Sequence, residues 1–399
     1  MSFAMSRLAH VKPSASAGIS QQARALGKAG KDIIDLGLGE PDFDTPEHII
    51  EAAYEAAKAG QTRYPPTAGT LTLKESIVEK FRRDNGLEFS PDEIIVSNGA
   101  KQVLFAAFMA SLEPDQEVIG CAPYFDSYQN MVTVVGGKFK AVSCHAKDGF
   151  LLQPDALEAA ITPETRWLIL NSPSNPAGAT YTKTDFQALA DVLKHHPQVL
   201  ILSDEIYEHI VFDDFEPVSF SKACPELFER TLTVNGVSKA YAMTGWRIGF
   251  GAGPKDLITA MTTTQSQISS GACSVAQAAA KAALDGPQDC VAVFKAAYER
   301  RRNLVVNSIA EIKGLSLTIP KGAFYALIAC EELIGKSYEA FEIKDDASFT
   351  GYLLQEACIA SVPASAYGVT NYFRISTASS EETLGLAMQN LSDAVNKLI

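Results

Sequence analysis

The stretch NGVSKAYAMTGWRIGF, residues 235–250, lies between two apolar runs that are typical of β-strands, RTLTV before it and RIGFGAG at its end. Lys239 lies near its middle and Arg247 follows eight residues later, although the segment is otherwise suited to burial. A buried charge is costly unless a partner of opposite charge or a hydrogen bond compensates it. The two cations therefore indicate a ligand site at the end of a strand. An ordinary loop lysine and a surface salt bridge are the alternatives at this point.

Short β-rich runs continue outward from this stretch, and segments with helical periodicity, such as AKQVLFAAFMASL and TKTDFQALADVLKHH, separate most of them. Continuous apolar strands that alternate with helices favour a mostly parallel sheet covered on both faces. We therefore predict an α/β protein whose large domain contains a mostly parallel, seven-stranded sheet. From about residue 290 a long charged helix and mixed elements predict a smaller α+β domain. The seven predicted strands lie in EIIVSNG, EVIGCAP, GKFKAVSCH, RWLILNSP, VLILSDE, RTLTVNG and RIGFGAG.

Composition excludes several classes of function. The net charge is -13, and no run of basic residues offers the clustered cations that nucleic acid binding needs. The apolar run VLFAAFMASL is about half as long as a membrane span. The first residues, MSFAMSRLAHVKPSASAG, do not resemble a signal peptide, and seven cysteines without a C-x-x-C pair fit a reducing compartment. We expect a cytoplasmic protein with no nucleic acid or membrane partner.

Four of the predicted strands end in residues that suit a binding site, in the segments SNGAKQ, NSPSNPAG, SDEIY and NGVSK. Ligands of open α/β sheets bind beyond the carboxyl ends of the strands. These segments together supply small residues, amides, two adjacent carboxylates and a lysine. We expect them to form one site.

The chemistry of each segment can be predicted, with an alternative beside it. A helix that begins at about Ala100 offers free N–H groups and a positive dipole end to an anion, but a simple strand-to-helix turn has the same pattern. Asp204 suits a cationic ligand atom, whereas Ser203 or Asp204 can instead cap a helix. A desolvated Lys239 loses its proton readily and forms Schiff bases, and Arg247 suits bidentate phosphate binding.

Other motifs are incomplete. SFSK (219–222) has the S-x-x-K spacing of serine–lysine acyl transfer, but no S-D-N or K-T-G motif follows it. GLGEPD (37–42) begins like a dinucleotide-binding loop but lacks its third glycine. No H-E-x-x-H motif or Cys/His cluster is present, so we expect no metal.

The motif SKAYAMTGWRIG resembles the pyridoxal-phosphate lysine motif of class I/II aminotransferases of fold type I. The resemblance covers nearly the whole chain, and it is strongest to the bacterial aspartate and aspartate/prephenate aminotransferase subgroup. It implies an N-terminal arm with part of the small domain at 1–45, a large cofactor-binding domain at 46–288 and a small C-terminal domain at 289–399. The other matching blocks, in order, are LGLGEPDFDTP, YPPTAG, SNGAKQ, APYFDSY, NSPSNPAGA, SDEIYEH, KGAFYAL and NYFRIS.

The resemblance implies pyridoxal 5'-phosphate (PLP) as cofactor and assigns most of its contacts. Lys239 would bind PLP covalently and carry a proton between substrate and cofactor. Asp204 would pair with the pyridine nitrogen. The remaining expected cofactor contacts are Tyr207 and Asn175 at the 3' oxygen, Arg247, Gly99, Ala100 and Lys101 at the phosphate, Phe125 on the ring, and Tyr64 at the phosphate of a neighbouring subunit. The contact from Tyr64 implies a homodimer with shared active sites.

Substrate residues follow from the same resemblance. Arg374 would bind the α-carboxylate, with Gly39 and Asn175 nearby. Lys101 matches a lysine associated with the distal carboxylate of acidic substrates, and Lys12 matches one linked to prephenate use; either can also be an ordinary exposed lysine. Phe125 is a departure, because the subgroup has a tryptophan there that stacks and donates an N–H group.

We therefore expect transamination between an L-amino acid, aspartate or glutamate, and a 2-oxo acid, 2-oxoglutarate or oxaloacetate. An aromatic, broad-specificity or prephenate aminotransferase is the main alternative. Another PLP reaction, such as β-elimination, is also open because this fold serves several chemistries. A non-catalytic regulator is a further alternative, but only about 30 residues precede the first matching block, too few for a DNA-binding module.

Overall fold

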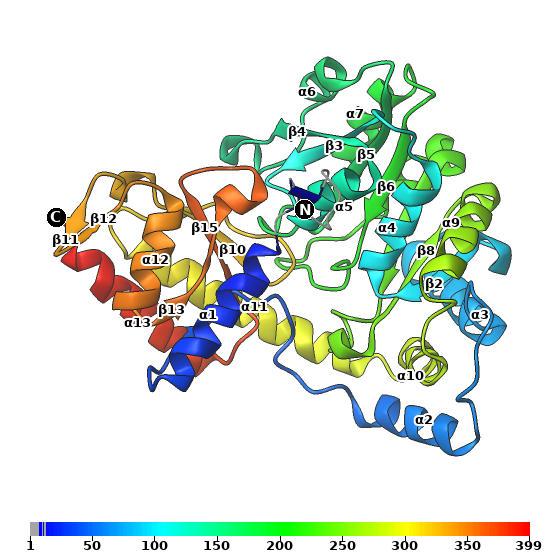
Figure 1. Ribbon diagram of the computed structural model, residues 1–399, viewed down its shortest axis with the longest axis horizontal. Helices are drawn as coiled ribbons and strands as arrows, with labels where there is room; N and C mark the ends of the chain where they lie inside the picture. Colours follow the sequence, from blue (N-terminus) through cyan, green and yellow to red (C-terminus); the bar gives the residue numbers. More distant parts are fainter. Residues whose placement is uncertain (1–7, 10, 12) are drawn as a thin grey trace, which may run out of the picture.

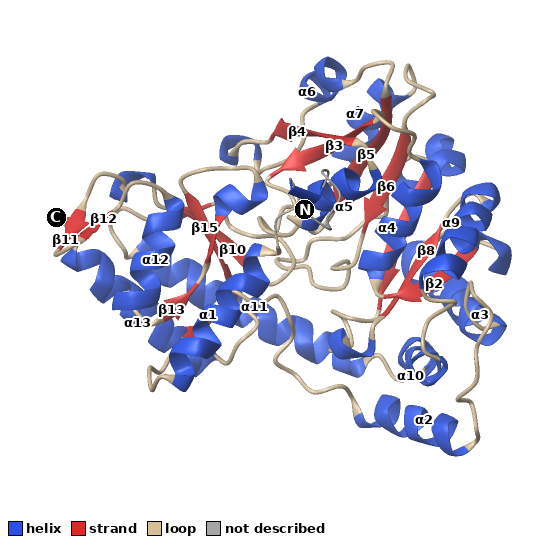
Figure 2. Cartoon of the chain, in the orientation of Figure 1, coloured by secondary structure: helices blue, strands red, loops and turns tan. Residues whose placement is uncertain are grey.

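The computed structural model describes residues 8–9, 11 and 13–399, so Lys12 lies outside the described residues. Its largest feature is a seven-stranded sheet in the order β2-β8-β7-β6-β5-β3-β4 (Figures 1 and 2). Strand β8 is antiparallel to both of its neighbours, and the other pairs are parallel. The prediction of a mostly parallel, seven-stranded sheet is confirmed. The strands are β2 (Ile94–Asn98), β3 (Glu117–Ala122), β4 (Lys138–Ser143), β5 (Thr165–Asn171), β6 (Leu200–Asp204), β7 (Thr231–Gly236) and β8 (Ile248–Ala252).

Alternating side chains of these strands enter separate apolar layers, because successive residues of a strand point to opposite faces. In β6, Ile201 packs on one side and Leu202 on the other. Both faces are therefore covered by helices, as the continuous apolar strands predict. One face packs against α4 (Ala100–Ser111), α5 (Ser127–Val135) and α9 (Lys255–Ile268). The other packs against α6 (Pro154–Ala160), α7 (Lys183–Leu193) and α8 (Phe220–Ala223) and, nearer β2 and β8, against α2 (Glu47–Lys58), α3 (Leu71–Lys80) and α10 (Ser274–Asp285).

A second, smaller sheet lies apart from the first, on the left of Figure 1. It is antiparallel, in the order β14-β15-β10-β9, and it has its own apolar core. The N-terminal segment joins this part of the molecule through parallel pairing of β1 (Ile34–Asp35) with β13 (Ile359–Ala360). Its remaining elements are α1 (Ala15–Lys28), α11 (Asp289–Ala310), α12 (Asp346–Glu356), α13 (Glu381–Lys397), β9 (Ser316–Leu317), β10 (Tyr325–Ala329), β14 (Val362–Pro363), β15 (Tyr372–Ser376) and the short pair β11 (Ser337–Tyr338) and β12 (Phe341–Glu342).

This arrangement brings three separate parts of the chain to one place. The carboxyl ends of β5, β6 and β7 open on the same edge of the large sheet, as parallel strands require. Strand β15 and the segment after β1 approach that edge from the smaller part. Among the described residues, no helix combines the length and the apolar character that a bilayer crossing requires.

Candidate active site

A cavity of about 390 Å³ lies at this edge of the sheet. Gly99 lies beside it as the N-cap residue of α4. Tyr64 is 94 % exposed and does not line the cavity of its own chain. The predicted site residues that do line it are Gly39, Ala100, Lys101, Phe125, Asn175, Asp204, Tyr207, Lys239, Arg247 and Arg374.

Lys239 follows β7 and points into the cavity, so it is not an ordinary exposed loop lysine. Its Nζ donates a hydrogen bond to the Gly39 carbonyl oxygen at 2.6 Å and lies 5.6 Å from the ring centres of Tyr207 and Phe324. Burial lowers the pKa of Lys239 to about 8, although the Glu40 carboxylate works against this change. A larger fraction of this amine is therefore neutral near neutral pH than in an ordinary lysine.

Arg247 and the start of α4 form a cationic corner of the cavity. The helix begins at Ala100, as the sequence predicts, after Gly99 with a φ of 81°. A Cβ atom on Gly99 would lie 2.2 Å from Nη2 of Arg247, so the close approach requires glycine. Arg247 donates to the carbonyl oxygens of Thr244 and Asn98 and forms no ion pair within the described residues. A free guanidinium beside a helix N-terminus suits an anion such as phosphate.

Asp204 ends β6, lines the same cavity and is 5 % exposed. Burial raises the pKa of its carboxyl group to about 6, against the hydrogen bonds from the Tyr128 hydroxyl (2.6 Å) and the Ile206 amide (3.4 Å). No helix begins at Ser203 or Asp204; the chain turns instead, and the Ser203 hydroxyl donates to Glu205. The helix-cap alternative is wrong because β6 continues to its buried end. A carboxylate in this position suits a cationic ligand atom.

Arg374 comes from β15 and closes the cavity from the smaller sheet. It is 2 % exposed, and its guanidinium lies 4.6 Å from the ring centre of Tyr325. It donates to Asn175 Oδ1 and Ser16 Oγ, each at 3.1 Å, and to the Gly37 carbonyl oxygen, but its Nε has no hydrogen-bond partner. Within the described part of the chain it forms no ion pair. A buried arginine without a carboxylate partner is suited to an acidic ligand.

Two tyrosines belong to the site but were not singled out in the sequence. The Tyr325 hydroxyl is 2.8 Å from the Tyr207 hydroxyl. A Cβ atom on Gly39 would lie 2.1 Å from the Tyr325 hydroxyl oxygen. The Tyr128 hydroxyl donates a hydrogen bond to Asp204 Oδ2. Both occur in blocks that carry the family resemblance, KGAFYAL and APYFDSY, which is the one signal that could have indicated them.

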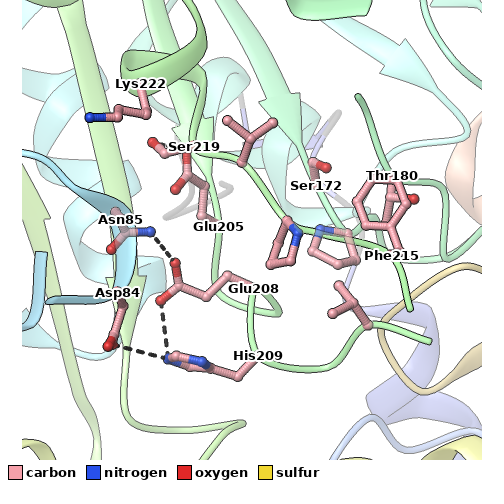
Figure 3. A pocket seen from close by; sticks show the side chains of 14 residues that line it. Asp84, Asn85, Ser172, Thr180, Glu205, Glu208, His209, Phe215, Ser219 and Lys222 are labelled. Atoms are coloured by element: carbon pink, nitrogen blue, oxygen red, sulfur yellow. Dashed lines mark hydrogen bonds and ion pairs between the residues drawn. The ribbon is translucent and has the colours of Figure 1, made fainter. Parts of the chain in front are cut away.

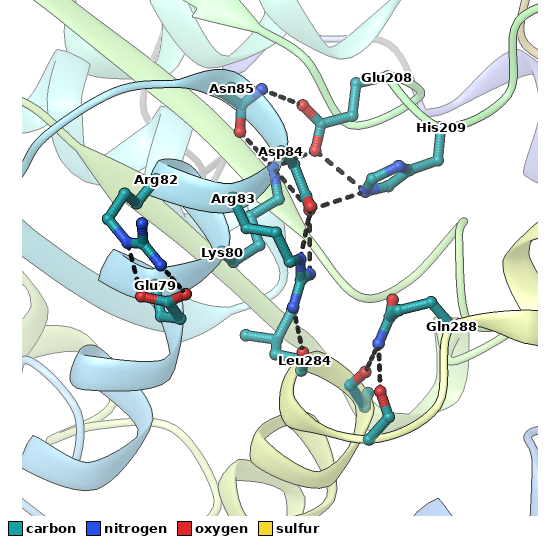
Figure 4. Close-up of polar contacts among 12 residues, drawn as sticks. Glu79, Lys80, Arg82, Arg83, Asp84, Asn85, Glu208, His209, Leu284 and Gln288 are labelled. Carbon is teal, nitrogen blue, oxygen red and sulfur yellow. Dashed lines mark hydrogen bonds and ion pairs between the residues drawn. The ribbon is translucent and has the colours of Figure 1, made fainter.

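An ionic network contacts the turn at residues 204–209, which contains Asp204 and Tyr207, and holds this turn in place (Figure 4). Glu208 is paired with Lys80 and accepts a hydrogen bond from Asn85 at 2.6 Å. Burial alone would raise the pKa of Glu208, but Lys80, His209 and the hydrogen bond from Asn85 together outweigh it and lower that pKa to about 2. His209 Nε2 lies 3.3 Å from Glu208 and 3.6 Å from Asp84.

A separate cavity of about 110 Å³ adjoins this network (Figure 3). The ligating atoms of Asp84, Glu208 and His209 lie within 4.8 Å of one another, a spacing that a metal ion could bridge. The Lys80 ammonium already pairs with Glu208 at this point, however, and supplies the positive charge that the carboxylates need. We therefore interpret the network as an anchor for the turn at 204–209.

Known proteins of one family match nearly the whole chain. Residues 31–391 match the family described as aminotransferase class I and II. The chain is 49 % identical over 394 residues to an aspartate aminotransferase of Rhizobium meliloti, covering 98 % of this chain and 96 % of that protein. It is 50 % identical over 385 residues to an aspartate/prephenate aminotransferase of Cereibacter sphaeroides, with 96 % of each covered. The crystal structure of the aspartate aminotransferase from Rhizobium meliloti superposes with a TM-score of 0.97 at 48 % identity over 100 % of both chains.

Proposed function

The chain belongs to the class I and II aminotransferases, and from this premise we propose that it transfers amino groups with PLP as cofactor and with aspartate or glutamate as donor. The acceptors in this proposal are 2-oxoglutarate and oxaloacetate. The observation that carries it is the placement of four groups around one cavity: Lys239, Asp204, Arg247 at the start of α4, and Arg374 without a carboxylate partner.

The residues of the cavity fit PLP at both ends. Arg247 and the N–H groups at Gly99, Ala100 and Lys101 would hold the phosphate, in a corner where a Cβ atom on Gly99 would collide with Arg247. Asp204 would accept a hydrogen bond from the protonated pyridine nitrogen, because it is a buried carboxylate without an ion-pair partner among the described residues. When bound, PLP supplies an electron sink for negative charge at the substrate α-carbon.

The chain itself supplies the base and the orientation of the substrate. Lys239 would hold the cofactor through Nζ and, when its amine is free and neutral, would take the proton from the α-carbon and return it. Arg374 would bind the α-carboxylate with its free Nε and fix the direction of the Cα–H bond toward Lys239. Tyr207 and Asn175 would hydrogen-bond the 3' oxygen of the cofactor. Gly39, which has no Cβ atom, allows the Tyr325 hydroxyl to approach beside it.

Preference for acidic substrates would come from Lys101. Its Nζ lies 5.1 Å from the ring centre of Phe125 at the mouth of the cavity, where Arg247 and Arg374 already have other roles in this proposal. A distal carboxylate of aspartate or glutamate would pair with Lys101. Phe125 can stack on the cofactor ring but offers no N–H group, so aromatic amino acids or prephenate form the second candidate class. The name of the Cereibacter sphaeroides relative supports this second class.

We also propose a homodimer with shared active sites. Tyr64 is 94 % exposed, and Tyr54, Leu71 and Ile50 are exposed large apolar residues in the same stretch of the chain, α2 to α3. Association of two subunits through this stretch would cover these exposed apolar side chains. Tyr64 would reach the phosphate bound by the partner subunit. The cytoplasmic location and the domain boundaries at residues 45 and 288 remain predictions of the same kind.

A panel of amino donors tests the substrate proposal directly. The purified protein, loaded with PLP, is assayed with aspartate, glutamate, phenylalanine and tyrosine against 2-oxoglutarate and oxaloacetate, and with prephenate as acceptor. We expect the highest kcat/KM for aspartate or glutamate. A higher value for an aromatic donor or for prephenate would overturn the preference for acidic substrates, and no transamination with any pair would overturn the function.

A further inference from the structure

Asp204 is a buried carboxylate that accepts two hydrogen bonds. The Tyr128 hydroxyl donates to Oδ2 at 2.6 Å, and the Ile206 amide donates to Oδ1 at 3.4 Å. Within the described residues, Tyr128 is the one side chain that donates to this carboxylate. The bond is also the shorter of the two, so Tyr128 carries most of the stabilisation that the chain itself gives to the charged form of Asp204.

The position of Tyr128 leaves its hydroxyl little freedom. Tyr128 is the second residue of α5 and is 2 % exposed. Its ring packs in the apolar cluster beneath the cavity and meets Phe125 edge to face, with ring centres 5.5 Å apart and planes at 89°. Phe125 lies just before α5, and its carbonyl oxygen accepts a hydrogen bond from the Tyr128 amide, so both side chains line the same cavity.

The two influences on Asp204 act in opposite directions. Burial favours the neutral carboxyl group, and a donated hydrogen bond favours the carboxylate. A hydrogen bond to a charged group changes an equilibrium constant by about 10- to 100-fold. A neutral carboxyl group cannot keep a proton on a pyridine nitrogen, because it does not supply the negative charge that stabilises the pyridinium.

We propose that Tyr128 is a positioning residue whose hydroxyl keeps Asp204 ionised and oriented, so that Asp204 holds the proton on the ring nitrogen of PLP. This inference rests on the proposed function, since it assumes that PLP occupies the cavity. It assigns Tyr128 to the cofactor through Asp204 rather than by contact. Removing the hydroxyl leaves the packing of the ring in place.

Cofactor affinity tests the inference without relying on turnover. Fluorescence titration of apo protein gives the Kd of PLP and of 1-deaza-PLP, in which a CH group replaces the ring nitrogen. We expect Tyr128→Phe to raise the Kd of PLP about tenfold at pH 5, where the lost hydrogen bond leaves less of Asp204 ionised, and to change it little at pH 8, where Asp204 is ionised in both proteins. The Kd of 1-deaza-PLP should stay unchanged or fall, because that analogue has no ring N–H for Asp204. Tyr124→Phe is the matched control: it deletes a hydroxyl that donates to Gln129, away from Asp204, and should change neither value.

The pH dependence and a double-mutant cycle complete the test. In Tyr128→Phe, the pH below which PLP affinity declines should move upward by about one unit, the equivalent of a tenfold change. In an Asp204→Asn background, Tyr128→Phe should cost nothing further. An equal loss of affinity for both cofactors, no loss for PLP, or a loss that persists with Asn at 204 would overturn the inference and leave the proposed function intact. A wild-type protein that binds no PLP would instead refute the proposed function.

Discussion

At neutral pH, the apo protein should be less stable with Asp204 than with an uncharged residue at this position. Its carboxyl group is 5 % exposed, and burial raises its pKa from 3.8 to about 6. Asp204→Asn keeps an acceptor for the Tyr128 hydroxyl while it removes the charge. We therefore expect the substitution to stabilise the apo protein.

The sign and the size of the effect follow from the difference in pKa between the folded and unfolded states. A carboxyl group whose pKa is raised on folding holds its proton more tightly in the native state than in the unfolded state. Below the unfolded pKa the group is protonated in both states, and its contribution to stability is complete. That contribution is lost as the pH rises through about 6. The change from 3.8 to about 6 corresponds to about 3 kcal/mol above pH 7. At pH 4 the same calculation leaves less than about 1 kcal/mol.

Urea unfolding of the two apo proteins at equal concentration, at pH 8 and at pH 4, measures this difference. We expect Asp204→Asn to gain up to about 3 kcal/mol at pH 8 and little at pH 4. Glu208→Gln is a control of opposite sign, because the pKa of Glu208 is lowered to about 2 and its charge stabilises the fold at neutral pH. A gain for Asp204→Asn that is the same at both pH values, or no gain at all, would refute the reasoning.

Five further variants have expected outcomes. Lys239→Ala should bind PLP without a covalent link and lose turnover, and borohydride should fix the cofactor on Lys239 in the wild type; labelling of another residue would contradict the assignment. Arg374→Ala should lower kcat/KM for every α-amino acid by about 100-fold or more, measured by steady-state kinetics. Phe125→Trp should raise kcat/KM for aspartate relative to that for phenylalanine. Lys101→Ala should lower the same ratio. Lys80→Met should destabilise the protein by about 3–5 kcal/mol in urea, since it leaves the buried Glu208 carboxylate without its ion-pair partner.

The elements of the large sheet could be predicted because their signals are local. Each of the seven strands is a short apolar run that ends in small or polar residues, and the start of α4 at Ala100 follows directly from the glycine before it. The meeting of Asp204 and Lys239 also follows, because carboxyl ends of parallel strands share one edge. Arg247 reaches the same edge at the amino end of β8, which runs antiparallel to β7. These inferences need only the order of elements and one rule of topology.

The contacts that complete the site join residues far apart in the chain. Tyr128 is 76 residues from Asp204, Tyr207 is 118 from Tyr325, and Ser16 is 358 from Arg374. No periodicity or spacing links such pairs. The helix cap expected as an alternative at Ser203 or Asp204 fails for a related reason: Ser and Asp favour caps locally, but strand pairing carries β6 to its end at Asp204, and the Ser203 hydroxyl bonds Glu205.

Burial acts on the two key charges of the site in the same way, although they have opposite signs. It lowers the pKa of Lys239 to about 8 and raises that of Asp204 to about 6, so each group is less stable in its charged form than it would be in water. The two pKa values lie on opposite sides of neutral pH, and both residues line one cavity. A ligand with a pyridinium near Asp204 and a carbonyl carbon near Lys239 would relieve both costs at once, because it would give the carboxylate a cation and take up the neutral amine. Binding therefore recovers stability that the apo protein lacks, and the increase in Tm on adding PLP should be larger for the wild type than for Asp204→Asn.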